Sequence, residues 1–132
     1  MRSGPGLLRA LPLLFSTVLA AAPGSTFEKD VLPIFTAHCF ACHGGTSMIG
    51  LDLRTAQSVL KGSHNGKVLV AGDSAESLLY QKVSAREMPP KAFNLDLSEA
   101  QIETIKNWIE EGAPHEKVQP VLTADQVERF NH

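Results

Sequence analysis

The sequence predicts an all-α domain of about four short helices. Three capping boxes, which begin at Ser25, Asp73 and Ser98, stand before apolar residues spaced three and four apart. This is the pattern of helices with one buried face. Glycines follow several of these stretches, as they do at the ends of helices. The alternating pattern of a half-buried strand is scarce, so we expect little or no sheet.

The first helix is expected to begin near Ser25 and to continue through the apolar residues of 31–35 to Gly44. Pro33 interrupts this stretch. If Asp30 caps a restarted helix, Pro33 falls in the first turn, where its missing N–H group has no helical partner to lose.

Asp52 is expected to cap a second helix over 53–61, which Gly62 ends. A turn over 64–66 and a short extended segment over 67–70 follow.

The third helix is expected behind the box at Asp73, with an apolar stripe over 75–83. Residues 85–97 then form a loop, because the two prolines after Met88 exclude regular helix or strand around it. The last helix follows Ser98. Its apolar face is formed by Ile102, Ile105, Trp108 and Ile109.

The two ends of the chain are expected to lie outside the folded domain. Residues 1–22 are typical of a signal peptide, because two arginines precede an apolar stretch over 11–19 that ends in small residues. The apolar stretch is short for a membrane span, and an uncleaved anchor is the alternative. Residues 23–117 form the expected domain, and residues 118–132 form a tail with one marginal helix.

The charge of the chain is mildly acidic. The chain carries 12 basic and 14 acidic residues, and removal of Arg2 and Arg9 with the signal leaves a net charge of about −4. A nucleic-acid-binding domain needs a surplus of basic residues against phosphate, so nucleic acid is not an expected partner. We find no serine-histidine-aspartate set and no glycine-rich phosphate loop in the sequence, and so expect no enzyme of those classes.

Both cysteines of the chain lie in the run Cys39-Phe40-Ala41-Cys42-His43. A Cys-x-x-Cys-His run is the attachment site of a c-type haem. Residues three apart share a helix face, so both thiols can reach the two vinyl groups on one haem edge. His43 then binds iron from the proximal side. We therefore predict one haem c, covalently attached through Cys39 and Cys42.

A disulfide and half of a zinc site are the alternatives for this cysteine pair. Neither explains His43. A redox disulfide of this spacing is expected after a strand in a chain of alternating strands and helices, and zinc needs two further ligands nearby.

Iron bound by one histidine needs a second axial ligand or an open site. We predict Met88, because its proline-rich loop is far enough along the chain to reach the other haem face, and a thioether favours ferrous iron. Met48 is the rival thioether, but it follows closely behind His43, which leaves a short connection to lead around the haem edge. His64 is the alternative for a bis-histidine site.

Several further residues have weaker assignments. Arg54, Arg86 and Lys91 are candidates for pairing with the two haem propionates, although a solvated surface charge is the more common role. Trp108 is expected to pack a helix against haem or against another helix. The remaining histidines, which we expect to be exposed or to make only local contacts, are His38, His115 and His132.

Together, the signal segment, the helix ending in Cys-x-x-Cys-His, the methionine-proline loop and the final amphipathic helix resemble class I cytochromes c. The segment from Phe27 to Pro114 is similar to the planctomycete-type cytochrome c domain. The segments that carry this similarity are Asp30-Val31-Leu32-Pro33-Ile34, Gly50-Leu51-Asp52-Leu53-Arg54, Gly72-Asp73-Ser74, Leu78-Leu79-Tyr80, Met88-Pro89-Pro90 and Trp108-Ile109-Glu110-Glu111-Gly112-Ala113.

The resemblance implies a small cytochrome c-like domain with about four helices packed around one haem c. It implies thioether links at Cys39 and Cys42 and axial ligation of the haem iron by His43 and Met88. Because covalent haem attachment takes place outside the cytoplasm in bacteria, we expect a periplasmic carrier of single electrons. Its partners are expected to be redox proteins, and its mature chain is not expected to insert into a membrane. A ligand-exchanging haem enzyme and a sensory or interaction module related to a larger multidomain protein are the alternatives.

Overall fold

The computed structural model describes residues 4, 6 and 24–117, and these residues form helices and turns without any strand. The predicted all-α class is therefore confirmed for this part of the chain. None of the helices here has the length and apolarity to cross a membrane. The predicted signal peptide, residues 1–22, and the predicted tail, residues 118–132, lie outside the described residues apart from two glycines. The helical elements in chain order are η1 (Phe27–Val31), α1 (Leu32–His38), α2 (Phe40–His43), η2 (Met48–Gly50), α3 (Ala56–Lys61), α4 (Leu78–Ser84), η3 (Lys91–Phe93) and α5 (Glu99–Glu110).

The first helical arm, η1 with α1 and α2, follows the predicted course with two corrections at its start. Thr26, and not the predicted Ser25, caps it by accepting a hydrogen bond from the Lys29 N–H group (3.4 Å). Pro33 lies in the first turn of α1, as expected. Asp30 does not cap a new helix, because its carboxylate accepts a hydrogen bond from the Thr26 N–H group (2.8 Å) and the backbone continues in a helical conformation.

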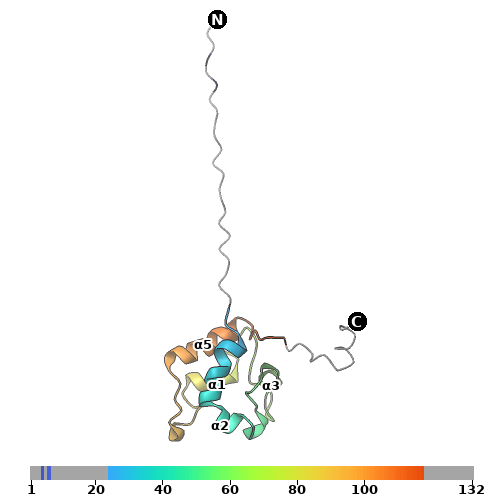
Figure 1. Cartoon of the computed structure of the whole chain (residues 1–132), viewed down its shortest axis with the longest axis vertical. Helices are drawn as coiled ribbons and strands as arrows, with labels where there is room; N and C mark the ends of the chain where they lie inside the picture. The colour runs from blue at the N-terminus through green and yellow to red at the C-terminus, as the bar shows by residue number, and fades with distance from the viewer. Residues whose placement is uncertain (1–3, 5, 7–23, 118–132) are drawn as a thin grey trace, which may run out of the picture.

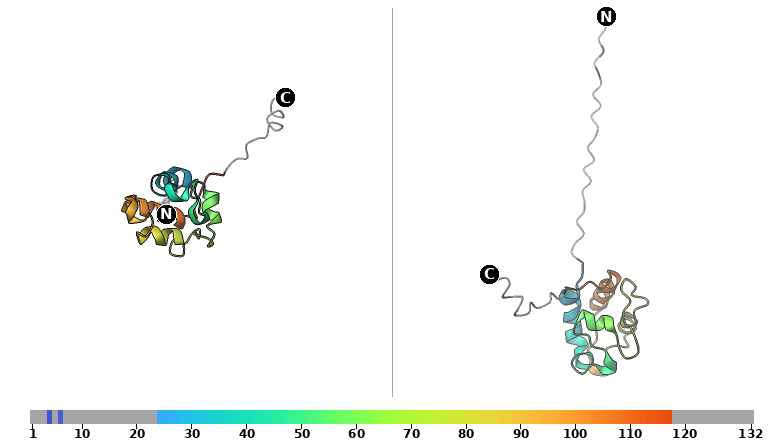
Figure 2. Two further views of the ribbon diagram at one scale, coloured as in Figure 1. Left: turned by 90° about the horizontal axis from the view of Figure 1, so that it is seen from below. Right: turned by 90° about the vertical axis from the view of Figure 1, so that its right-hand side faces the viewer.

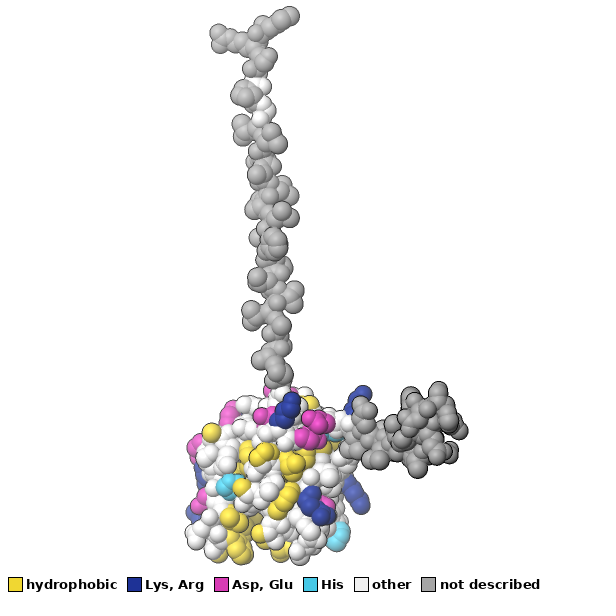
Figure 3. All heavy atoms as spheres, in the orientation of Figure 1, with side chains coloured by type: hydrophobic (Ala, Val, Ile, Leu, Met, Phe, Trp, Pro, Cys, Tyr) yellow, Lys and Arg dark blue, Asp and Glu magenta, His cyan; other side chains and the backbone are white. Residues whose placement is uncertain are grey.

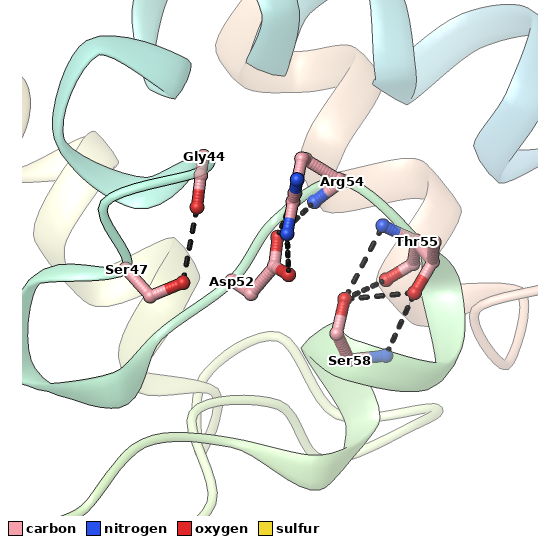
Figure 4. Close-up of polar contacts among 6 residues, drawn as sticks. All are labelled: Gly44, Ser47, Asp52, Arg54, Thr55 and Ser58. Carbon is pink, nitrogen blue, oxygen red and sulfur yellow. Dashed lines mark hydrogen bonds and ion pairs between the residues drawn. The ribbon is translucent and has the colours of Figure 1, made fainter.

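The second predicted helix begins later than the sequence indicated. The cap of α3 is Thr55, whose hydroxyl accepts from the Ser58 N–H group (3.1 Å), and the Ser58 hydroxyl in turn accepts from the Thr55 N–H group (Figure 4). Asp52 was the expected cap. Its carboxylate instead accepts hydrogen bonds from the backbone and the guanidinium of Arg54 (2.9–3.0 Å). The Asp52 carboxylate therefore binds Arg54 instead of the free N–H groups at the start of a helix.

The third predicted helix also begins later. Asp73 accepts a hydrogen bond from the Glu76 N–H group (3.1 Å), which forms a turn, and α4 starts only after the buried Ser77. The Ser77 hydroxyl accepts from the Val70 N–H group (2.9 Å), and this bond ties the turn to the preceding segment. By contrast, α5 has the predicted Ser98 capping box and the predicted buried face.

The apolar core has residues from η1, α1, α3, α4 and α5. Its aromatic part lies where the first arm packs against α5 (Figure 1). The Phe27 ring packs against Phe35 and Trp108, with ring centroids 6.0 and 5.7 Å apart. Trp108 is fully buried, and its indole N–H group donates to the Pro114 carbonyl (2.9 Å), so its polar atom is satisfied. Trp108 thus packs helix against helix. Seen from below, the first arm, α3, α4 and α5 surround the centre of the domain (Figure 2).

The two ends of the domain lie side by side. The Phe27 N–H group donates to the Pro114 carbonyl (2.9 Å), and the Ser25 N–H group donates to a Glu111 carboxylate oxygen (2.9 Å). In Figure 1 this edge is opposite the end that carries α2.

Candidate functional site

Two apolar cavities meet beside α2. The larger has a volume of about 330 Å³ and the smaller about 150 Å³. Pockets of several hundred Å³ with apolar walls and a few polar groups are typical binding sites for small molecules and cofactors. Exposed hydrophobic side chains also cover the middle and the lower edge of the face in Figure 3, whereas acidic side chains gather towards its upper edge. The residues that line both cavities are Cys39, His43, Ile49 and Met88.

One wall of the larger cavity is the junction of α1 and α2. The Cys39 N–H group donates to the Phe35 carbonyl (2.8 Å) and the His43 N–H group to the Cys39 carbonyl (2.8 Å), so helical bonding continues through the motif. This turn brings Cys39 and Cys42 to the same wall, where both are free thiols. The predicted spacing argument therefore agrees with the placement of the two cysteines.

The Cys39 thiol has low reactivity at neutral pH. Burial, and to a smaller extent the nearby Cys42, raises the pKa of Cys39 to about 12. A thiol with such a pKa stays protonated at neutral pH, which makes it a poor nucleophile for disulfide exchange and a poor metal ligand. In the described part of the chain, no group of three or more histidine, cysteine, aspartate and glutamate side chains is placed to hold a metal ion. Neither the disulfide nor the zinc alternative gains support here.

His43 ends α2 and is half-buried. Its carbonyl accepts a hydrogen bond from the Leu53 N–H group (2.8 Å), which fixes the end of the helix. The ring atom Nδ1 is buried and has no hydrogen-bond partner among the described residues. Buried polar atoms almost always have a partner, so Nδ1 is an exception that the described residues leave unsatisfied. Because Nδ1 is covered by protein, it does not face the two cavities that His43 lines. Haem iron takes an imidazole nitrogen as its proximal ligand.

Met88 comes to the same cavities from the loop of residues 85–97, between α4 and α5. Its side chain is 42% exposed. The N–H groups of Met88 and Glu87 donate to the Lys82 carbonyl at the end of α4 (3.2 and 3.0 Å). These bonds turn the chain directly before the methionine and hold it at the cavity.

The base of the Met88 loop is closed by Arg86. Its Nη1 atom donates to the Leu97 carbonyl (2.7 Å), and its Nη2 atom pairs with Glu99 in the first turn of α5. Both ends of the loop are thereby fastened to each other. Arg86, a predicted candidate for a haem propionate, has a structural role in the described chain.

The other predicted propionate partners do not line either cavity. Arg54 pairs with Asp52 and is about half exposed. Chiefly through this hydrogen-bonded pair, the guanidinium lowers the pKa of the Asp52 carboxyl. Lys91 is exposed at the start of η3.

Lys82 is a cation at the cavity wall that the sequence reasoning missed. It lines the smaller cavity and pairs with Glu87. Within the sequence it is one lysine in a helix with an exposed face, so its position at the cavity had no local signal.

The rival axial ligands have different surroundings. Met48 lines the larger cavity and is 53% exposed, but it does not line the smaller one. His64 is exposed and lines neither cavity, and its ring lies directly against Gly50. His115 makes the expected local bond, to the Ala113 carbonyl (3.2 Å), and His132 lies outside the described residues.

The expectation that His38 is exposed or makes only local contacts is wrong. His38 is half-buried, lines the larger cavity and bonds to Leu95 and Gln101, which are 57 and 63 residues away. Ile49 was also missed. It has a left-handed backbone (φ 53°), a conformation that is strained for a β-branched residue and that often occurs at functional sites.

These observations describe a small helical domain whose Cys-x-x-Cys-His run and methionine loop line the same apolar cavities. The family model described as Planctomycete cytochrome C matches residues 39–92, less than half of the chain. The match runs from the first cysteine past Met88 and confirms the resemblance found in the sequence. It supports a c-type cytochrome, and that family implies haem c. The comparisons with curated proteins and with solved structures give no match.

Proposed function

We propose that this chain is an exported c-type cytochrome that carries single electrons by means of one covalently attached haem. In this proposal Cys39 and Cys42 form the thioether links, and His43 and Met88 are the axial ligands of the iron. About four helices pack around the cofactor. The haem, when bound, supplies the one-electron change between ferric and ferrous iron.

The observation that carries the proposal is the shared lining of the two cavities. One end of the site holds the Cys-x-x-Cys-His run, and Met88 reaches the same site from a loop 45 residues further along the chain. His43 lines both cavities, so its imidazole lies beside any group bound there. The apolar walls suit a porphyrin, and a thioether ligand favours ferrous iron, which raises the reduction potential.

An electron carrier works best when the ligands of its iron do not exchange. The bonds from Lys82 and Arg86 hold the Met88 loop at its first residues and at its base, which supports fixed ligation over an open site. A ligand-exchanging haem enzyme would need Met88 to leave the iron readily. Export and redox partner proteins follow from this proposal, because covalent haem attachment is extracytoplasmic in bacteria.

The test compares Met88→Ala with Met48→Ala in the exported, haem-loaded protein. Met48 is the matched control, since it is a thioether that lines the larger cavity and is also partly exposed. We expect the sulfur-to-ferric-iron absorption band to disappear in Met88→Ala and to remain in Met48→Ala.

Three other outcomes have distinct meanings. Loss of the band only in Met48→Ala would reverse the ligand assignment. A wild-type protein that lacks the band and binds carbon monoxide readily in the ferrous state would favour the haem enzyme. A wild-type protein without covalent haem would contradict the proposal as a whole.

A further inference from the structure

His38 joins three segments that lie far apart in the sequence. It is the last residue of α1, directly before Cys39, and its side chain lines the larger cavity. Its Nδ1 atom is 2.8 Å from the Leu95 carbonyl oxygen, in the second half of the Met88 loop. Its Nε2 atom is 3.2 Å from the side-chain nitrogen of Gln101, in the first turn of α5.

These partners determine where the imidazole proton lies. A carbonyl oxygen can only accept, so Nδ1 carries the hydrogen and donates to Leu95. The Gln101 amide is oriented independently, because its oxygen accepts a hydrogen bond from the Ser98 N–H group (2.8 Å) in the capping box. Its NH₂ group therefore points to His38 and donates to Nε2. The two bonds require the same neutral tautomer and are mutually consistent.

The bond to Leu95 connects two walls of the site. Cys39 belongs to the wall that follows α1, whereas Met88 belongs to the loop of residues 85–97. The contacts of Lys82 and Arg86 fasten this loop to its own base at α4 and α5. His38 fastens the loop's second half to the helix that carries the first cysteine.

We propose that His38 is a positioning residue for the Met88 side of the haem site. It holds the loop closed towards the wall that carries Cys39, so that the thioether stays at the iron. This inference rests on the proposed function. Loss of the bond to Leu95 lets the loop open more often, and an external ligand for ferric iron then competes more successfully with Met88.

The experiment titrates imidazole against the ferric, haem-loaded protein and follows the visible spectrum. In His38→Ala we expect imidazole to bind about tenfold more tightly, which corresponds to about 1.4 kcal/mol. The sulfur-to-ferric-iron band should weaken before any imidazole is added. His115→Ala is the matched control, because His115 is half-buried but bonds only to the neighbouring Ala113 carbonyl in the described chain. The affinity of this variant for imidazole should equal that of wild type.

Two conservative variants separate the two arms of His38. The amide nitrogen of an asparagine occupies about the place of Nδ1, so His38→Asn keeps the donor to Leu95 and should resemble wild type. A glutamine reaches about the place of Nε2 and loses the bond to Leu95, so His38→Gln should resemble His38→Ala. This comparison also decides the question if His38→Ala does not fold.

The proposal is overturned if the glutamine variant binds imidazole within twofold of wild type, whatever the affinity of the asparagine variant. It is also overturned if His115→Ala shows the same gain in affinity as His38→Ala. A failure of the proposed function is distinguishable from these results, because the wild-type protein would then lack either covalent haem or the sulfur-to-iron band.

Discussion

At the scale of single residues, two groups of the site have unusual surroundings. The pKa of Cys39 is raised to about 12, and one ring nitrogen of His43 is buried without a partner. A thiol that stays protonated at neutral pH is protected against oxidation, because oxidation starts from the thiolate.

The burial of Cys39 predicts slow alkylation in the haem-free chain. In a Cys42→Ser variant without haem, we expect iodoacetamide at pH 9 to modify Cys39 at least about tenfold more slowly in buffer than in concentrated urea, because only the thiolate reacts. Desolvation, the larger cause of the raised pKa, does not depend on Cys42. Mass spectrometry of timed samples measures the two rates. Equal rates would mean that the haem-free chain does not bury this residue.

The raised pKa of Cys39 also makes the stability of the folded haem-free chain depend on pH. The folded pKa of Cys39 lies above the value of about 8.5 for an unfolded cysteine. The unfolded chain therefore loses this proton first. The folded haem-free state keeps its full stability below about pH 8 and loses stability between about pH 9 and pH 12.

Residues of the site differ in how far the sequence predicts them. Cys39, Cys42 and His43 form one contiguous motif whose spacing has a single strong interpretation, and the prolines beside Met88 mark it as a loop residue. His38 has no such signal, because its partners become neighbours only when α1, the loop and α5 pack together. Long-range contacts of this kind depend on tertiary structure that local patterns do not contain.

At the scale of elements, capping decides where the short helices begin. Thr55 and Ser58 exchange hydrogen bonds at the start of α3, a helix of only six residues. So short a helix has little internal stability, and its cap contributes a large share.

We predict that Thr55→Ala lowers the free energy of unfolding of the haem-loaded protein by about 1 kcal/mol, the usual cost of losing such a cap. Asp52→Ala, the matched control, should have a smaller effect, because the Arg54 side chain of this pair is about half exposed and water weakens the attraction between the two charges. Chemical denaturation followed by far-ultraviolet circular dichroism measures both variants. A larger loss in Asp52→Ala would restore Asp52 as the residue that fixes the start of this helix.

The sequence patterns predict some helix starts better than others. Ser98 has no competing partner close in the chain, so its capping box forms as expected. Asp52 and Asp73 each satisfy a backbone N–H group within three residues in a turn, which is the common alternative for aspartate. Aspartate is favoured both at the start of a helix and in a turn, so the residue type alone did not decide between these two structures at either position.

At the scale of the whole molecule, the apolar residues form a buried core and a less covered part. The core has residues from η1, α1, α3, α4 and α5, and some of them, such as Phe35 and Leu79, also line the smaller cavity. The other part lines the two cavities and includes large exposed side chains, namely Met48, Ile49, Leu78, Met88 and Phe93. A domain of this size has little spare stability, so a cofactor that covers the second part contributes to folding.

We therefore predict that the haem-loaded protein melts at least about 10 °C above a haem-free Cys39→Ala/Cys42→Ala chain. A domain of roughly 100 residues gains about 4–8 °C for each kcal/mol, and covering the cavity walls contributes a few kcal/mol. Differential scanning calorimetry gives both melting temperatures. Addition of free haem to the haem-free chain tests whether attachment or mere occupancy is responsible. Equal melting temperatures would show that the helices do not need the cofactor for their packing.

The class of the fold was predictable because helical periodicity and capping are local properties, and the core residues of α5 follow directly from its apolar stripe. The cavities were not predictable from composition or periodicity. Their walls combine residues from α1, α2, η2, α4 and the Met88 loop, and the left-handed turn at Ile49 that contributes to both has no sequence marker.

The neighbouring ends of the domain determine how it responds to attachment. A polypeptide continued beyond Ser25 and Glu116 leaves through one small area, away from the end with α2 (Figure 1). Near this area the Phe27 N–H group and the Pro114 carbonyl join the two arms by a backbone hydrogen bond. The domain can therefore be tethered by both ends while the side that carries α2 and the cavities stays uncovered by the tethers.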